Sequence, residues 1–388
     1  MIGQKGIPAR SGGIERHVES LTHELAALGH EIVVYCRAWY SQDAIRTPGI
    51  HLQETGGITT KHLDAITHSF TALCHAALEK VDIVHIHGVG PALLAPLARL
   101  LLPKTPIVVT FHSVDRDHEK WGRFARWMLK TGERCACHFA DATIAVSESL
   151  RLYAQKTYGQ RTIYLPNGVS LPSGAATQAQ LDVFGLKPDE YVLMCARLVR
   201  HKGAHTLIDA WQRLSLEQPK LTRGKKLVIV GGSAFTDGYV DELKAMAAHD
   251  PRIVLTGPQY GQALHALFSY AHSVVHPSVS EGLPIAILEA MSYGKTVLAA
   301  NIPENLELTK DYGRSFTAGS TKELTHKLSE LLTLKKSERA SIGAAARTFV
   351  KTSYQWKEVA QSTSDLYRAL AQLKTYHQNL PTRLVHAD

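Results

Sequence analysis

The stretch Glu281-Gly-Leu-Pro-Ile-Ala-Ile-Leu-Glu289 decides the fold of this chain, and the short apolar run Ser273-Val-Val-His276 stands just before it. The run has the composition of a buried strand, the Gly-Leu-Pro segment predicts a turn, and the apolar residues after Pro284 predict a helix that carries Glu289. A helix that begins near Pro284 would turn both carboxylates toward the carboxyl edge of a parallel sheet, where open α/β folds bind ligands. Two carboxylates suit a polyhydroxylated ligand such as a sugar or a ribose, because each accepts several hydrogen bonds.

A structural role for the same two acids is the alternative. Glu281 would then cap the helix, and Glu289 would be a solvated helix residue. The spacing of the two acids alone recurs by chance in helices, but a Glu-Gly-Leu-Pro turn directly after a strand is much more specific. The sequence context therefore favours a binding role.

Strand and helix patterns alternate through most of the 388 residues. This alternation predicts an α/β protein with parallel sheets, and the length suggests two doubly wound domains. A helix is expected over 14–28 and another over 356–374, and the turn-rich segment Pro166–Gly174 is the best linker between the two halves. The expected strands are 31–36, 81–87, 106–111, 142–146 and 162–165 in the first half, and 191–196, 226–230, 252–255, 273–276 and 296–300 in the second.

The amino terminus lacks a full first strand, because the chain opens with Met1-Ile-Gly-Gln. A doubly wound domain places its first strand near the centre of the sheet. Either this strand is very short or the natural amino terminus lies upstream, and we expect the second.

Bulk composition restricts the partners and the compartment. The formal net charge is +8 and the pI about 9.1, which favours anionic partners without choosing among nucleotides, phospholipids and nucleic acid. The cysteine count of five is odd and shows no framework spacing, so reduced thiols in a cytoplasmic protein are expected. Cys135-Ala-Cys137 lacks the second pair that a zinc site needs. The sequence has neither a signal peptide nor an apolar run long enough to span a bilayer, which predicts a soluble or peripheral protein.

Two groups at predicted strand ends or helix starts could bind an anion. Gly12 and Gly13 precede the first helix, where backbone N–H groups and the helix dipole favour negative charge. Arg197 and Lys202 follow a predicted strand in one loop and suit a diphosphate. The alternatives are a flexible turn for the glycines and solvated loop charges for the two cations.

Histidines lie at the ends of two other predicted strands. His112 comes directly after the strand 106–111 and could hydrogen-bond a substrate hydroxyl, although a lone histidine is more often structural. His85 and His87 lie on one face of their strand, where they either line a binding site or pack in the core. The sequence has no HExxH, Walker A or GxSxG pattern and no complete GxGxxG.

A basic amphipathic segment covers residues 116–134. Its cations recur at steps of three and four residues and predict one charged helical stripe, while Trp121, Phe124 and Met128 form another face. Such a helix suits an anionic lipid surface or an anionic acceptor, and an ordinary surface helix is the alternative. The stripe consists of Arg116, Lys120, Arg123, Arg126, Lys130 and Arg134.

The combined motifs resemble retaining glycosyltransferases of the GT-B fold, of the family 4 (group 1) type. The matching segments follow the family's order and are 6–15, 82–87, 166–169, 196–203 and 281–289. The resemblance implies two Rossmann-like domains that face each other across a cleft. Residues 1–168 would form the acceptor-side domain, with a carboxyl-terminal helix over about 352–388 packing back on it, and 169–351 would bind the nucleotide sugar.

The resemblance also implies roles for individual residues. Glu289 would bind the ribose hydroxyls, and Glu281 would bind hydroxyls of the donor sugar with help from backbone amides near Gly282 and Leu283. Arg197 and Lys202 would neutralise the departing diphosphate. The glycine pair Gly12 and Gly13 would contact the diphosphate, and His112 the donor sugar near the reacting carbon.

The expected activity is transfer of a hexose-type sugar, with retention, from a nucleotide-diphosphate donor to a glycan or lipid-linked acceptor in cell-surface polysaccharide biosynthesis. The resemblance implies no metal and no cofactor besides the donor, and we expect no nucleic-acid partner. We expect the protein in the cytoplasm, either free or peripheral on the inner face of the cell membrane. The alternatives are a nucleotide-sugar 2-epimerase or hydrolase on the same scaffold and a non-catalytic nucleotide-binding protein.

Overall fold

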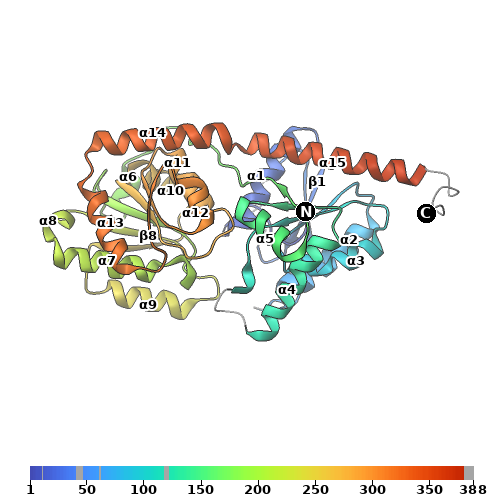
Figure 1. Ribbon diagram of the computed structural model, residues 1–388, viewed down its shortest axis with the longest axis horizontal. Coiled ribbons are helices and arrows are strands. Elements are labelled where there is room, and N and C mark those ends of the chain that lie inside the picture. Colours follow the sequence, from blue (N-terminus) through green and yellow to red (C-terminus); the bar gives the residue numbers. More distant parts are fainter. Residues whose placement is uncertain (11, 41–46, 61–62, 118–121, 380–388) are drawn as a thin grey trace. The chain divides into compact units, whose positions relative to one another are not determined.

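The structure is a computed structural model that describes residues 1–10, 12–40, 47–60, 63–117 and 122–379 and divides into two compact units (Figure 1). Unit 1 consists of Met1–Asn167 together with the chain from Trp356 onward, and unit 2 consists of Gly168–Gln355. All paired strands within the sheets of both units are parallel, as the alternation of strands and helices predicted.

Unit 1 contains a two-stranded sheet and a four-stranded sheet of order β3-β4-β5-β6. Met1 and Ile2 join the two sheets: the amide of Tyr35 donates to the Met1 carbonyl (3.1 Å), and the amide of His87 donates to the Ile2 carbonyl (2.8 Å). Ile2 thus makes an isolated bridge to Ile86 of β3, at the place where a first strand would pair. The strands are β1 (Ile32–Arg37), β2 (Ile50–Thr55), β3 (Val84–His87), β4 (Ile107–Phe111), β5 (Ala142–Ala145) and β6 (Ile163–Tyr164).

Helices of unit 1 include one from the far end of the chain. α15 (Trp356–Asn379) packs against α1 (Gly13–Ala27), and the buried Trp356 and Tyr367 share an apolar cluster with Val18. The other helices are α2 (Asp64–Leu78), α3 (Ala95–Leu101), α4 (Arg123–His138) and α5 (Glu148–Tyr158), with 3-10 turns η1 (Pro91–Leu94) and η2 (Asp115–Asp117).

Unit 2 has one parallel sheet of six strands in the order β12-β11-β10-β7-β8-β9. The chain first builds outward from β7 to β9 and then returns to add β10 beside β7, so the strand order reverses between β7 and β10. In open α/β sheets this reversal opens a crevice beyond the carboxyl ends of the two strands. The strands are β7 (Tyr191–Cys195), β8 (Lys226–Val230), β9 (Ile253–Gly257), β10 (Ser273–His276), β11 (Val297–Ala300) and β12 (Arg314–Phe316).

Helices cover both faces of this sheet (Figure 1). The fully buried Trp211 of α7 lies in a cluster with strand residues such as Ile229 and Leu298 and with residues of α9 and α13. The helices are α6 (Ala179–Asp182), α7 (Ala204–Glu217), α8 (Pro219–Thr222), α9 (Asp237–Ala247), α10 (Gly261–Tyr270), α11 (Ile285–Ser292), α12 (Pro303–Thr309), α13 (Thr321–Thr333) and α14 (Lys336–Ser353), with the 3-10 turn η3 (Arg200–Lys202). In neither unit does any helix of the described residues have the length and apolarity that are needed to cross a membrane.

Candidate functional site

The two loops that leave β7 and β10 carry most of the predicted donor-binding residues. Arg197 and Lys202 follow β7, and Glu281 follows β10. Because β7 and β10 are neighbours at the point where the strand order reverses, both loops lie at the same edge of the unit 2 sheet.

Hydrogen bonds and a close backbone approach join these two loops. The carbonyl of His201 accepts from the amide of Val279 at 2.9 Å and from the Ser278 hydroxyl at 3.2 Å. Gly203 has a positive φ of 74°, and a Cβ at this position would lie 2.5 Å from the carbonyl oxygen of Pro277. Glycine is therefore required at residue 203 for the β7 loop to approach the β10 loop.

Lys202, Glu281 and His276 form one largely buried polar cluster. Glu281 Oε1 accepts from Lys202 Nζ at 2.5 Å and from His276 Nε2 at 2.7 Å. Burial alone would raise the pKa of Glu281, but the Lys202 ammonium and the hydrogen bond from His276 outweigh burial and hold that pKa well below its usual range. Glu281 is thus ionised at neutral pH. Since both contacts go to Oε1, Oε2 keeps no partner among the residues that the structure describes.

The remaining predicted residues of unit 2 lie in the loop after β7 and in the segment that runs from Glu281 into α11. Arg197 is half-buried, and its guanidinium makes no hydrogen bond or ion pair with any described residue. Gly282 and Leu283 are buried between Glu281 and the start of α11, and Glu289 is half-buried on α11. Arg200, in the same loop, instead pairs with Glu242 at the surface.

The glycine pair of unit 1 lies at the amino end of α1, as the sequence predicted. Gly12 is the residue before the helix and has a φ of 98°, and a Cβ there would lie 2.1 Å from Glu15 Oε2. Gly13 is exposed and has no atom within 4 Å of the position a Cβ would take, which leaves its backbone open to a ligand.

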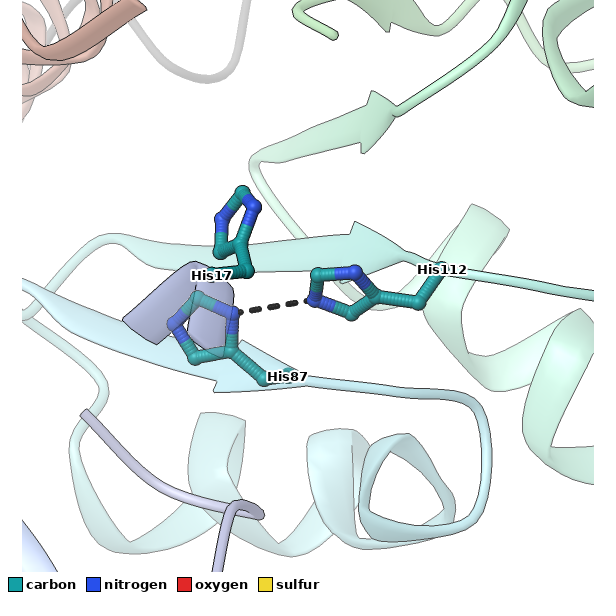
Figure 2. Close-up of side chains that lie close together, drawn as sticks. All are labelled: His17, His87 and His112. Carbon is teal, nitrogen blue, oxygen red and sulfur yellow. Dashed lines mark hydrogen bonds between the residues drawn. The ribbon is translucent and has the colours of Figure 1, made fainter. Parts of the chain in front are cut away.

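His112 lies in a cluster that the sequence did not predict (Figure 2). His17 of α1, His87 of β3 and His112 after β4 are all buried, and one ring nitrogen from each lies within 4.8 Å of the other two. Burial lowers the pKa of His17 to about 4 and holds the pKa values of His87 and His112 well below the usual range. The three rings come from segments far apart in sequence, so no spacing pattern identified them.

His85 has the packing role that was one of its two alternatives. Its ring nitrogens are hydrogen-bonded inside the unit, Nδ1 to the Tyr367 hydroxyl at 2.5 Å and Nε2 to the Thr110 hydroxyl at 2.6 Å. The ring stacks on His87 with centroids 4.1 Å apart, so the two residues share a face as expected.

The basic segment is not one continuous helix. Arg116 lies in η2 and donates to the buried carboxylate of Glu133 at 3.2 Å, so its inclusion in an exposed stripe was wrong. Lys120 and Trp121 lie outside the described residues. The helix α4 begins at Arg123, and on it Arg123, Arg126 and Lys130 are exposed, as are Phe124 (74%) and Trp127 (60%).

Two family models together match nearly the whole chain. The model described as Glycosyltransferase Family 4 matches residues 11–172, and the model described as Glycosyl transferases group 1 matches residues 178–349. The chain belongs to this family of GT-B glycosyltransferases and is a glycosyltransferase enzyme. The non-catalytic alternative is therefore not supported.

Named relatives of known activity class agree with this family assignment. The chain is 23% identical over 378 residues to the phosphatidylinositol N-acetylglucosaminyltransferase gpi3 subunit of Schizosaccharomyces pombe, covering 92% of this chain and 78% of the relative. It is 28% identical over 325 residues to α-maltose-1-phosphate synthase of Mycobacterium tuberculosis, covering 75% and 80%.

Solved structures share the fold along almost the entire chain. A sucrose-phosphate synthase from Thermosynechococcus elongatus superposes with a TM-score of 0.77 at 19% identity, covering 94% of this chain and 96% of that one. HepE from Anabaena, solved with UDP and glucose, superposes with a TM-score of 0.75 at 19% identity, covering 94% and 98%. The predicted fold class, with two Rossmann-like domains, is confirmed.

Proposed function

We propose that this glycosyltransferase moves a hexose-type sugar from a nucleotide-diphosphate donor to a glycan or lipid-linked acceptor in cell-surface polysaccharide biosynthesis. The observation that carries the proposal is the cluster of Lys202, Glu281 and His276, with Arg197 on the same loop, at the strand-order reversal of unit 2. A similar fold in a structure solved with UDP and glucose supports a nucleotide-sugar donor.

The donor would be held by complementary charge. Glu281 Oε2, which has no partner among the described residues, would accept from hydroxyls of the sugar, with amides near Gly282 and Leu283 assisting. Breaking the sugar–phosphate bond builds negative charge on the diphosphate, and Lys202 and Arg197 would stabilise that charge because they are held in place beforehand. In unit 1, Gly12 and Gly13 would contact the diphosphate, and His112 would contact the sugar.

We further propose that transfer retains the anomeric configuration and needs no divalent metal. A departing phosphate oxygen would help to deprotonate the acceptor on the same face of the sugar. The two cations then neutralise charge that a metal ion would otherwise neutralise. Metal-free protein should remain active if the proposal holds.

A screen of nucleotide sugars by thermal shift tests the donor class, because a ligand that binds the folded state raises its apparent stability. The best donor is then incubated with and without glycan or lipid-linked acceptors. Sugar transfer to an acceptor supports the proposal, whereas donor hydrolysis that no acceptor diverts would favour the hydrolase. Rapid formation of an epimerised donor without acceptor would favour the 2-epimerase instead.

Glu289→Ala is expected to weaken nucleotide-sugar binding roughly 10- to 100-fold, because a charge-assisted hydrogen bond to a ribose hydroxyl contributes about 1.5–3 kcal/mol. Calorimetry with the ribonucleotide donor and with its 2′- and 3′-deoxy analogues isolates the effect. If Glu289 binds ribose, the variant loses affinity for the ribonucleotide but little for the deoxy analogue that lacks its partner. An equal loss for all three ligands would remove the ribose role.

We propose a cytoplasmic location with peripheral attachment to the inner face of the cell membrane through α4. Its exposed Phe124 and Trp127 beside Arg123, Arg126 and Lys130 suit the interface of an anionic bilayer. The same cations would also suit an anionic acceptor.

Charge reversal at Arg123, Arg126 and Lys130 to glutamate should abolish co-sedimentation with phosphatidylglycerol-containing vesicles, because each cation contributes about 1 kcal/mol near an anionic surface. A matched control reverses three exposed cations of unit 2, Lys220, Arg347 and Lys351. If both triple variants lose vesicle binding equally, attraction by net charge explains it and α4 has no specific role.

A further inference from the structure

The three histidines of unit 1 have the donor set of a metal site. His17, His87 and His112 each offer a ring nitrogen within 4.8 Å of the other two, and the rings converge from three separate elements (Figure 2). Neutral imidazole is the form that binds metal, and burial of all three rings favours the neutral form.

The hydrogen bonds of His17 leave one nitrogen available. Nδ1 of His17 lies 2.8 Å from the side-chain oxygen of Asn167, and since an amide oxygen only accepts, Nδ1 carries the hydrogen. Nε2 of His17 then holds a lone pair, and this atom is buried with no hydrogen-bond partner. Histidines that bind metal usually donate their second N–H to an oxygen in this manner.

The distance between the other two rings fits a shared ion. His87 Nδ1 and His112 Nε2 are 3.3 Å apart, whereas His87 Nε2 faces the Met1 sulfur at 3.4 Å. Zinc binds imidazole nitrogen at about 2.0–2.1 Å in tetrahedral sites, which places two such ligands about 3.3–3.4 Å apart. A metal ion could therefore bridge these two nitrogens at close to their present separation if the rings tilt toward it, while the His17 ring would close in.

We propose that His17, His87 and His112 bind a zinc ion through one nitrogen of each ring, with a fourth position left for an anion. The three neutral ligands bring no charge to offset that of the ion in a buried site, so hydroxide or another small anion completes the shell. His112 would also contact the donor sugar, so we expect bound zinc to inhibit transfer. Only this expected inhibition rests on the proposed function.

Titration of chelator-treated, metal-free protein with Co²⁺ and then Zn²⁺ tests the site directly. The expected result is the visible absorption of tetrahedral Co²⁺, displaced by one equivalent of Zn²⁺. His17→Ala should weaken Zn²⁺ binding at least about 100-fold. Loss of a residue that only hydrogen-bonds to a metal ligand already lowers metal affinity about 10–100-fold, and His17 would be a ligand itself. His68→Ala is the matched control, because His68 is equally buried in unit 1 but lies outside the cluster.

Asn167→Ala provides a second variant if His17→Ala fails to fold, with an expected loss of about 10-fold through its contact to His17. No tetrahedral cobalt spectrum, or equal Zn²⁺ affinity in the His68 variant and both cluster variants, would overturn the site. Zinc binding without inhibition of transfer would contradict only the expected inhibition through His112. The binding measurements need no nucleotide sugar, so they are independent of whether the proposed function is correct.

Discussion

Replacement of Lys202 by methionine is expected to lower kcat for sugar transfer about 10²–10³-fold, the usual effect of removing one preorganised group that stabilises transition-state charge. Methionine keeps the length and most of the apolar contact of the lysine stem but removes the ammonium. The donor should still bind through Glu289, so KM should change far less than kcat.

Arg200→Met is the matched control, because Arg200 is in the same 3-10 turn but pairs with Glu242 at the surface. Its kcat should remain within about twofold of the parent enzyme, as expected for an exposed ion pair. Equal losses in the two variants would mean that the β7 loop needs positive charge in general and that Lys202 has no specific role.

Stability must be separated from catalysis in the Lys202 variant. Removing Lys202 leaves the ionised Glu281 buried with only His276 as its partner, and breaking a buried pair in this way costs up to about 3–5 kcal/mol. The double variant Lys202→Met/Glu281→Gln removes both charges and should recover most of the free energy of unfolding. Its kcat should stay low, and recovered activity would contradict the charge-stabilising role of Lys202.

The pH dependence of stability gives an independent measure of the same pair. The folded-state pKa of Glu281 is depressed, so its contribution is present above the unfolded-state pKa and is lost as the pH falls through the folded-state pKa. Without Lys202 the folded-state pKa of Glu281 rises, so acid denaturation of the variant should begin at a higher pH. Denaturant unfolding followed by circular dichroism from neutral to acidic pH measures this shift.

Gly203→Ala is expected to destabilise unit 2 by about 2–4 kcal/mol, since it combines an unfavourable backbone conformation with a steric overlap. The new Cβ would lie 2.5 Å from the Pro277 carbonyl oxygen, and relief of this contact requires the two loops to separate. Lys202, the residue before Gly203, would then lose its short contact with Glu281, so kcat should fall together with stability.

Gly319→Ala isolates the cost of the overlap. Gly319 has a φ of 77°, close to the 74° of Gly203, but no atom lies within 4 Å of its Cβ position. This control should cost only about 1 kcal/mol, the ordinary penalty for alanine in a left-handed conformation. If denaturant melts of the two variants agree within error, the approach of the loops does not depend on glycine.

The alternation of apolar strands and helices was enough to predict the parallel sheets, because a buried parallel strand is apolar on both faces. All ten expected strands exist, but β2 and β12 were missed. β2 reads Ile-His-Leu-Gln-Glu-Thr and is mostly exposed or half-buried, and β12 has only three residues. Such edge strands lack the apolar pattern on which the prediction relied.

The site was predictable where its residues follow strands, and less so where the contacts are long-range. Arg197, Lys202 and Glu281 could be predicted to lie at one sheet edge because each lies just past a strand of the same sheet. His276 was missed as the second partner of Glu281, although it ends the very strand that precedes Glu281. The periodicity of the basic segment predicted Arg116 on the cationic stripe, but Arg116 pairs instead with the buried carboxylate of Glu133. A buried carboxylate needs a cation as partner, and this need is not visible in the spacing of the basic residues.

The position of α15 in unit 1 has a consequence for synthesis on the ribosome. Residues Val18, Leu21 and Leu25 of α1 pack with Trp356, Val359 and Tyr367, which are translated only after all of unit 2. Domains usually fold as they emerge, amino-terminal part first. Here all of unit 2 is translated before α15, so the side of α1 that packs on α15 has no covering helix until translation of unit 1 resumes.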